Sequence, residues 1–138
     1  MTAHLVPEQD VTTPARSPLF YTDVLGFEIA YERAEDQFVH LRLGGAELML
    51  EKILGRDRIT TGQLVRPFCR GMNPQIQIND LNTLMGRLDE AETAPLLPTE
   101  EGRYRRARTE VGNRQVWIQD PDGYLLRFYQ DLGERPMA

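Results

Sequence analysis

An order of elements that occurs twice is the feature of this sequence that most constrains its fold. Each half of the 138 residues predicts one strand, then one helix, then a series of further strands. The two halves share little sequence identity, so the repeat is one of structure. Such a repeat predicts two similar modules that pack their own helix against their own sheet.

In the first half, residues 4–11 read as a strand, and Thr13 and Pro14 predict the N-cap and first position of a helix. That helix is expected to run to about Leu25 and to stop at Gly26. Pro18 lies inside it and lacks an N–H, which predicts a kink or a tight first turn. Three strands follow, with Gly44-Gly45 as a hairpin turn; they are expected at residues 27–33, 37–43 and 46–53.

In the second half, residues 73–78 predict a strand, and Asn79 or Asp80 caps a helix over 81–91. Strand-like segments follow near residues 95–98, 103–109, 115–119 and 124–130. A turn joins the last two, because proline presets it and glycine supplies a positive φ; its residues are Asp120-Pro121-Asp122-Gly123. The domain organisation predicted is a first module at 1–54, a linker at 55–70 and a second module at 71–138, together one compact domain.

Composition limits the possible partners. A chain with 41% hydrophobic residues can bury a core, and a net charge of −5 disfavours nucleic acid as a partner. The apolar runs are too short to span a bilayer, and Met1-Thr2-Ala3-His4 lacks a basic start and an apolar segment, so we expect a cytoplasmic protein without a membrane partner. Cys69 is the only cysteine, which excludes an internal disulfide and a cysteine-based metal cluster.

Two segments carry a family resemblance. Residues 17–27 (SPLFYTDVLGF) resemble the helix-to-strand signature of the vicinal oxygen chelate, or glyoxalase/bleomycin resistance protein/dioxygenase, superfamily. Residues 120–128 (DPDGYLLRF) resemble its closing hairpin. The resemblance covers nearly the whole chain, from Leu5 to Asp131. It implies an α+β fold of two tandem βαβββ modules, whose curved mixed sheets enclose a cavity.

The enzymes of this superfamily hold one divalent ion through His, Glu or Gln. By resemblance, the four ligand positions fall on Val6, Met49, Asn73 and Arg127. Arg127 is the least suitable, because a guanidinium has no acceptor lone pair and is permanently positive. We therefore expect no metal and no other cofactor. A site built from His40, Glu47 and Glu51 remains a minority alternative.

Strand alternation separates two faces in each predicted sheet. The apolar face is expected to meet the helices; it carries Val39, Leu41, Leu43, Leu48, Leu50, Ile76, Ile78, Val116, Ile118, Leu126 and Phe128. The other face mixes aromatic, amide and charged side chains, a mixture that suits an organic ligand. The predicted ligand-binding residues are Phe38, His40, Met49, Glu51, Gln75, Gln77, Tyr104, Trp117, Arg127 and Tyr129.

The chain is most similar to the metal-free bleomycin-resistance proteins, through Leu48-Met49-Leu50-Glu51 and Leu125-Leu126-Arg127. The resemblance implies a homodimer that sequesters a bleomycin-type glycopeptide, or a similar aromatic and cationic compound, in a groove at the dimer interface, with no catalytic residue. The main alternative is a metal-dependent lyase, isomerase, dioxygenase or thiol transferase of the same superfamily. Two weaker alternatives are a metal-free enzyme that uses Glu8, Glu47 or Glu51 as base, and a structural module without a small ligand.

Overall fold

A computed structural model describes residues 3–53 and 60–137. The chain divides into two compact units. Unit 1 comprises Met1–Arg70 with Asp120–Tyr124, and unit 2 comprises Gly71–Gln119 with Leu125–Ala138. Residues 54–59, which include the first five residues of the predicted linker, lie outside the described residues, and residues 60–70 form neither helix nor strand.

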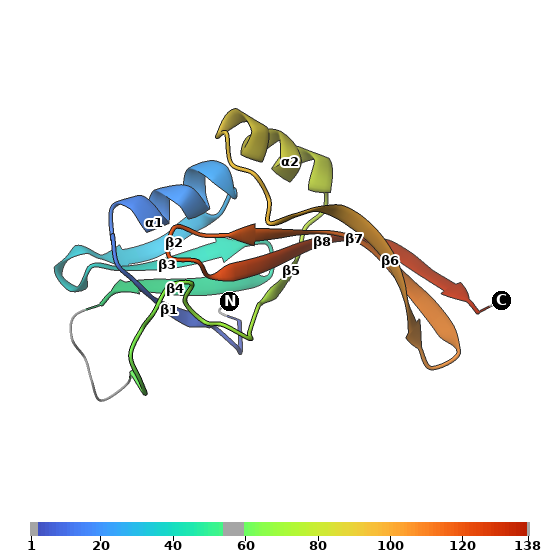
Figure 1. Cartoon of the computed structure of the whole chain (residues 1–138), viewed down its shortest axis with the longest axis horizontal. Helices are drawn as coiled ribbons and strands as arrows, with labels where there is room; N and C mark the ends of the chain where they lie inside the picture. Colours follow the sequence, from blue (N-terminus) through green and yellow to red (C-terminus); the bar gives the residue numbers. More distant parts are fainter. Residues whose placement is uncertain (1–2, 54–59, 138) are drawn as a thin grey trace. The chain divides into compact units, whose positions relative to one another are not determined.

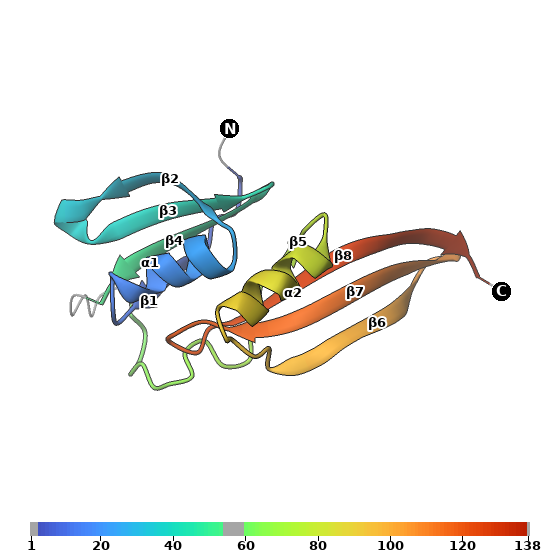
Figure 2. The same cartoon turned by 90° about the horizontal axis from the view of Figure 1, so that it is seen from above.

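Unit 1 consists of a four-stranded sheet in the order β1-β4-β3-β2, with a helical segment on one face (Figures 1 and 2). β1 is parallel to β4, and the other neighbours are antiparallel. Its elements are β1 (Glu8–Val11), α1 (Arg16–Leu19), the π-helical η1 (Phe20–Val24), β2 (Glu28–Arg33), the 3-10 turn η2 (Ala34–Asp36), β3 (Phe38–Leu43) and β4 (Ala46–Lys52).

Unit 2 repeats this arrangement with the sheet order β5-β8-β7-β6 and with β5 parallel to β8. Its elements are β5 (Gln75–Gln77), α2 (Leu81–Glu90), β6 (Leu97–Arg106), β7 (Thr109–Gln119) and β8 (Leu125–Pro136). Asp80 caps α2, because its side chain accepts a hydrogen bond from the Asn82 N–H. The predicted α+β fold of two βαβββ modules is thus confirmed.

The core of each unit lies between its helix and its sheet. Nine of the residues predicted to face the helices are buried: Val39, Leu41, Leu48, Leu50, Ile76, Val116, Ile118, Leu126 and Phe128. The other two, Leu43 and Ile78, are half-buried near the strand ends. Among the described residues, no helix combines the length and the apolar character that crossing a bilayer requires.

The first helix differs from its prediction. It begins at Arg16 rather than at Pro14, and the Thr13 carbonyl accepts hydrogen bonds from the Arg16 and Ser17 N–H groups. Pro18 is therefore the third helical residue, where an N–H has no partner within the helix, so its missing donor costs little. The irregularity comes later, as a π-turn in which the Leu25 N–H bonds the Phe20 carbonyl.

Several strands also differ from prediction. The predicted segments 95–98 and 103–109 are largely joined in one strand, β6, which ends at Arg106 and has a register shift between Leu97 and Glu100. β7 begins at Thr109 rather than at residue 115. β8 continues to Pro136, beyond the predicted end at residue 130, and β1 begins at Glu8 rather than His4. The extended parts of β6 and β8 run past the end of α2 (Figure 1) and are largely exposed, so they lack the apolar alternation by which strands are predicted.

The turn Asp120–Tyr124 is anchored within unit 1 by buried polar groups. Asp120 Oδ1 accepts from the N–H groups of Asp122 and Tyr124, each at 2.9 Å. Asp122 accepts from the N–H and hydroxyl of Thr12, at 3.1 and 2.5 Å, and pairs with Arg66 at 2.9 Å. These contacts satisfy two carboxylates that would otherwise be costly to bury.

Asp120 also contacts the hydroxyl of Tyr21, which lies between two acceptor oxygens. The Tyr21 hydroxyl lies 2.9 Å from Asp120 Oδ2 and 2.8 Å from Gln9 Oε1, and all three side chains are buried. A hydroxyl has one hydrogen, so it cannot donate to both oxygens. When Asp120 is ionised, Tyr21 donates to its carboxylate; once Asp120 is protonated, it can donate to Tyr21, and Tyr21 can then donate to Gln9. Burial, the largest cause, raises the pKa of Asp120 to about 6.

We expect stability to depend on pH through Asp120. Because its folded-state pKa lies above that of an unfolded aspartate, the native state binds the additional proton between about pH 6 and pH 4. Relative to Asp120→Asn, the wild-type free energy of unfolding should therefore rise by about 2 to 3 kcal/mol between pH 8 and pH 4. Urea unfolding at several pH values measures this difference. The control is Asp89→Asn, an exposed position of α2; parallel profiles for wild type and Asp120→Asn would contradict the expectation.

Candidate functional site

The ten predicted ligand-binding residues lie on two sheet faces. Phe38, His40, Met49 and Glu51 share the face of the unit 1 sheet that points away from α1, as their cross-strand partners show. Gln75, Gln77, Tyr104, Trp117, Arg127 and Tyr129 share the corresponding face of the unit 2 sheet. Each face is a site in its own right and is described separately.

On the unit 1 face, a buried histidine is held by a carboxylate. His40 Nε2 lies 2.8 Å from Glu47 Oε1, and the two residues are only 3% and 6% exposed. The other oxygen of Glu47 accepts from the Ala3 N–H, and Arg42 lies 3.6 Å from Oε1. The pKa of Glu47 is lowered, mainly by the hydrogen bond from the Ala3 N–H and also by His40. Desolvation of the carboxylate acts in the opposite direction but is outweighed. An ionised Glu47 therefore fixes the ring orientation of His40.

Aromatic rings cover this histidine. Tyr31 stacks on His40 at 4.9 Å between centroids and lies 5.9 Å from the Phe38 ring, while Arg33 sits 3.9 Å above Phe38. Tyr31 was not among the predicted site residues, and Glu47 was named only for the alternative metal site and as a possible base. A register shift between Ile29 and Tyr31 breaks simple alternation along β2, so no sequence pattern identified Tyr31.

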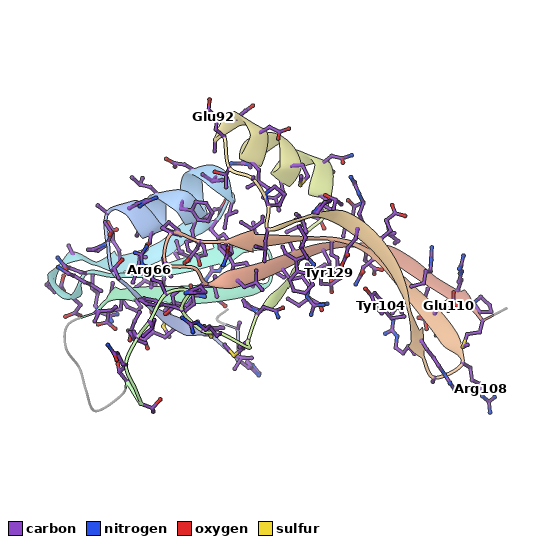
Figure 3. The ribbon with its side chains drawn as sticks, in the orientation of Figure 1. Arg66, Glu92, Tyr104, Arg108, Glu110 and Tyr129 are labelled. Carbon is purple, nitrogen blue, oxygen red and sulfur yellow. The ribbon has the colours of Figure 1, made fainter. Side chains whose placement is uncertain are left out.

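On the unit 2 face, Trp117 lies at the centre of a polar network. Glu100 Oε1 accepts from Gln115 Nε2 at 2.8 Å and from the Trp117 indole N–H at 3.4 Å. The Tyr104 hydroxyl lies 3.3 Å from Gln115 Nε2. In Figure 3, Tyr104 and Tyr129 both lie on the side of the sheet away from α2. The Tyr129 hydroxyl donates to Gln77 Oε1 at 3.1 Å.

Arg127 adds a cation to this network, with its guanidinium carbon 5.0 Å from the centre of the Trp117 ring. Buried polar atoms without a hydrogen-bond partner in the described structure include Gln115 Oε1 and Arg127 Nε on this face, together with the Oδ1 atoms of Asn73 and Asn113. Buried groups of this kind are uncommon in native proteins and call for a partner such as a ligand or water. The face thus combines flat apolar area with unsatisfied polar groups.

Glu100 is the functional candidate that sequence reasoning missed on this face. The predicted strands stopped at residue 98 and resumed at 103, so residue 100 was not assigned to either face of the sheet. In one continuous strand, alternation back from Tyr104 through Gly102 would have placed Glu100 beside Gln115, where the structure has it.

A separate pocket of about 280 Å³ lies on the helix side of unit 1. Its walls come from the residues before and within α1 and from the sheet below: Val11, Pro14, Ala15, Pro18, Glu32, Ala34, Gln37, Phe38, Val39 and Leu50. Its size is just below the range of about 300–1,000 Å³ typical of drug-sized ligands, and few polar groups converge there. We therefore base no function on it.

Comparison with known proteins places the chain in a family. No protein-family model matches it, and neither does any curated protein. A glyoxalase/bleomycin resistance protein/dioxygenase superfamily member from Vibrio splendidus 12B01 is 35% identical over 91% of this chain and 95% of that one. Its TM-score is 0.42, so the likeness is one of sequence. The chain belongs to this superfamily.

Structural likeness agrees on the fold. A glyoxylase/bleomycin resistance protein/dioxygenase domain from Frankia sp. EAN1pec matches with a TM-score of 0.66 at 20% identity, over 95% of this chain and 92% of that one. A lactoylglutathione lyase from Agrobacterium tumefaciens matches with a TM-score of 0.59 at 19% identity, over 94% of each chain. These matches show a shared fold, and that fold is used by an enzyme.

The residues at the superfamily's metal positions do not fit a divalent ion. Glu8, two residues beyond the predicted Val6, lies across from Met49, and Gln75, two beyond Asn73, lies across from Arg127. In each pair of parallel strands, β1 with β4 and β5 with β8, one of these residues is unsuited to a hard cation. Met49 offers a thioether, and Arg127 offers a guanidinium. In residues 3–53 and 60–137, no three His, Cys, Asp or Glu side chains converge as a metal site, so His40, Glu47 and Glu51 do not form one.

We expect Glu47→Ala to destabilise the protein by about 1–3 kcal/mol, because it leaves the buried His40 Nε2 and the Ala3 N–H without their acceptor. Glu47→Gln keeps an acceptor oxygen and should lose less. Since the pKa of Glu47 is lowered on folding, its contribution is present at neutral pH and is lost as the pH falls through that pKa.

Urea unfolding at neutral pH measures the difference. Glu35→Ala, at an exposed position of η2, serves as the control and should leave the midpoint nearly unchanged. Equal midpoints for Glu47→Ala and Glu35→Ala would show that the His40–Glu47 pair does not stabilise the fold.

Proposed function

We propose that this chain is a metal-free binding protein that sequesters a bleomycin-type glycopeptide, or a similar aromatic and cationic compound, without turnover. The proposal extends the resemblance to the bleomycin-resistance proteins beyond superfamily membership. The Trp117 network of unit 2 is the observation that supports it. Its residues are Gln75, Gln77, Glu100, Tyr104, Gln115, Trp117, Arg127 and Tyr129.

Trp117 is suited to hold a flat ring. Its indole N–H already has an acceptor in Glu100, so the ring plane can pack on an apolar group without leaving a polar atom unpaired. Around it, amide and hydroxyl groups supply direction, and Glu100 and Arg127 add one charge of each sign. This combination is typical of sites that orient an organic ligand by a few polar contacts.

The acidic groups favour a cationic part of the ligand. Glu100 lies beside Trp117 and is exposed, and the chain as a whole carries a net charge of −5. An exposed carboxylate beside an aromatic ring can attract an ammonium group, although salt screens that attraction. The predicted residues of the unit 1 face, Phe38, His40, Met49 and Glu51, belong to the same proposal as a second binding surface.

We further propose a cytoplasmic homodimer, with the ligand grooves at the interface between the chains. The support for this part is the resemblance alone. Light scattering coupled to size-exclusion chromatography tests it directly, since a monomer at working concentration would contradict it.

A metal-dependent lyase, isomerase or dioxygenase is the second candidate, and the fold shared with a lactoylglutathione lyase favours it. Such chemistry needs a Lewis-acid ion. The donors at the expected positions count against it, since Met49 and Arg127 offer no hard ligand. Metal that co-purifies in stoichiometric amount and an activity abolished by chelator would support this candidate over sequestration.

We expect a bleomycin-type glycopeptide to quench the fluorescence of Trp117 saturably, because Trp117 is the only tryptophan. Titration should end at about one ligand per chain with the compound unchanged afterwards, and saturating ligand should raise the melting temperature, since it binds only the folded state. Trp117→Ala should weaken binding, measured by calorimetry, by about tenfold or more.

Leu19→Ala provides the control for calorimetry. It removes an exposed apolar side chain of α1, on the helix side of the other unit, and should bind as the wild type does. If no quenching and no thermal shift are observed with the glycopeptide, it is not the ligand.

A further inference from the structure

Arg127 is a cation that has no ionic partner among the described residues. Its guanidinium makes no hydrogen bond or ion pair with any residue in the described parts of the chain, and its Nε is buried without an acceptor. Its guanidinium carbon lies 5.0 Å from the centre of the Trp117 ring. Other arginines of the two sheets do pair with a carboxylate. Arg135, for example, lies 2.9 Å from Glu110.

This arrangement leaves the useful part of the guanidinium free. A guanidinium that packs over an aromatic ring keeps its N–H groups around its edge, in a planar fork that matches a carboxylate or another oxyanion. The side chain is half-buried, so water satisfies those N–H groups incompletely, and an unpaired donor there is costly. An anionic oxygen at this edge would remove that cost.

The neighbours of Arg127 on its face are neutral. Gln75 is its partner on β5 and Trp117 is its partner on β7. Glu100 belongs to β6, on the far side of β7, and its Oε1 is engaged by Gln115 and Trp117. The face therefore presents a cation and an anion on opposite sides of one indole ring.

We propose that Arg127 is the anion-binding group of the unit 2 site, and that the natural ligand carries a carboxylate or similar oxyanion on or near its aromatic part. This rests on the proposed function, because it assumes that aromatic ligands pack at Trp117. It narrows the ligand class from aromatic and cationic compounds to aromatic compounds that also bear an anionic oxygen. Glu100 then receives the cationic group of such a ligand.

Three small aromatic probes of similar size test the charge preference: anionic benzoate, neutral benzamide of the same planar shape, and cationic benzylammonium, which should bind more weakly than benzoate and should not shift the Arg127 signal. Their binding is followed in the full chain by the NMR signals of the Trp117 indole N–H and the Arg127 Nε–H. Benzoate should shift both signals saturably and bind at least about tenfold more tightly than benzamide, with a downfield shift of Arg127 Nε–H. Added salt should weaken benzoate binding.

Variants separate a specific site from general attraction. Arg127→Met should bring benzoate binding down to the level of benzamide, and Arg127→Lys, which keeps the charge but loses the planar fork, should lose part of it. Arg114→Met is the matched control: it removes the same charge from β7 on the α2 side, where Arg114 bonds Asn82. It should bind benzoate as the wild type does.

The outcomes distinguish this inference from the proposed function. If benzoate binds no more tightly than benzamide, or if Arg127→Met and Arg114→Met behave alike, the anion site does not exist, even where the glycopeptide binds. If benzoate binds through Arg127 and the glycopeptide does not bind, the anion site stands and the ligand identity fails. If neither the probes nor the glycopeptide perturbs Trp117, both proposals are wrong.

Discussion

The pairing register between the last two strands of each unit is the constraint on which the other features depend. In β3 and β4, Leu41 faces Leu48 and His40 faces Met49. Alternation then directs the leucines of both strands toward the helix and directs Phe38, His40, Glu47, Met49 and Glu51 to the opposite face. A slip of one residue would expose the core and bury charges, so the apolar contacts hold the register. The same logic applies in β7 and β8, where Val116 faces Phe128.

The closing turn shows that a family signature can be structural. Asp120 and Asp122 are buried and use their oxygens to bind N–H groups of the turn, the Tyr21 hydroxyl, Thr12 and Arg66. Burial is the main reason why the pKa of Asp120 is raised to about 6. The oxygens of both carboxylates therefore already have hydrogen-bond partners within unit 1, so they are not available to bind a ligand.

The two sheet faces differ in how their polar groups are satisfied. On the unit 1 face, Glu47 is surrounded by donors and holds His40, so the pair is internally complete except for the second ring nitrogen. On the unit 2 face, Arg127 and Gln115 keep unsatisfied atoms beside Trp117. Recognition of a ligand uses groups that the protein itself has not paired, and for this reason both proposals are argued mainly from the unit 2 face.

The sequence alone determined the order of elements, the division of most strand residues between two faces and the placement of an arginine at residue 127, because these follow from local periodicity and turn chemistry. It did not locate Glu100 or Tyr31, since β6 has no apolar pattern and β2 has a register shift. Only the tertiary structure decided which groups are paired: alternation shows on which face a side chain lies, but not whether a residue from another strand meets it. The unpaired guanidinium of Arg127 could therefore be recognised only when the neighbouring strands were in place.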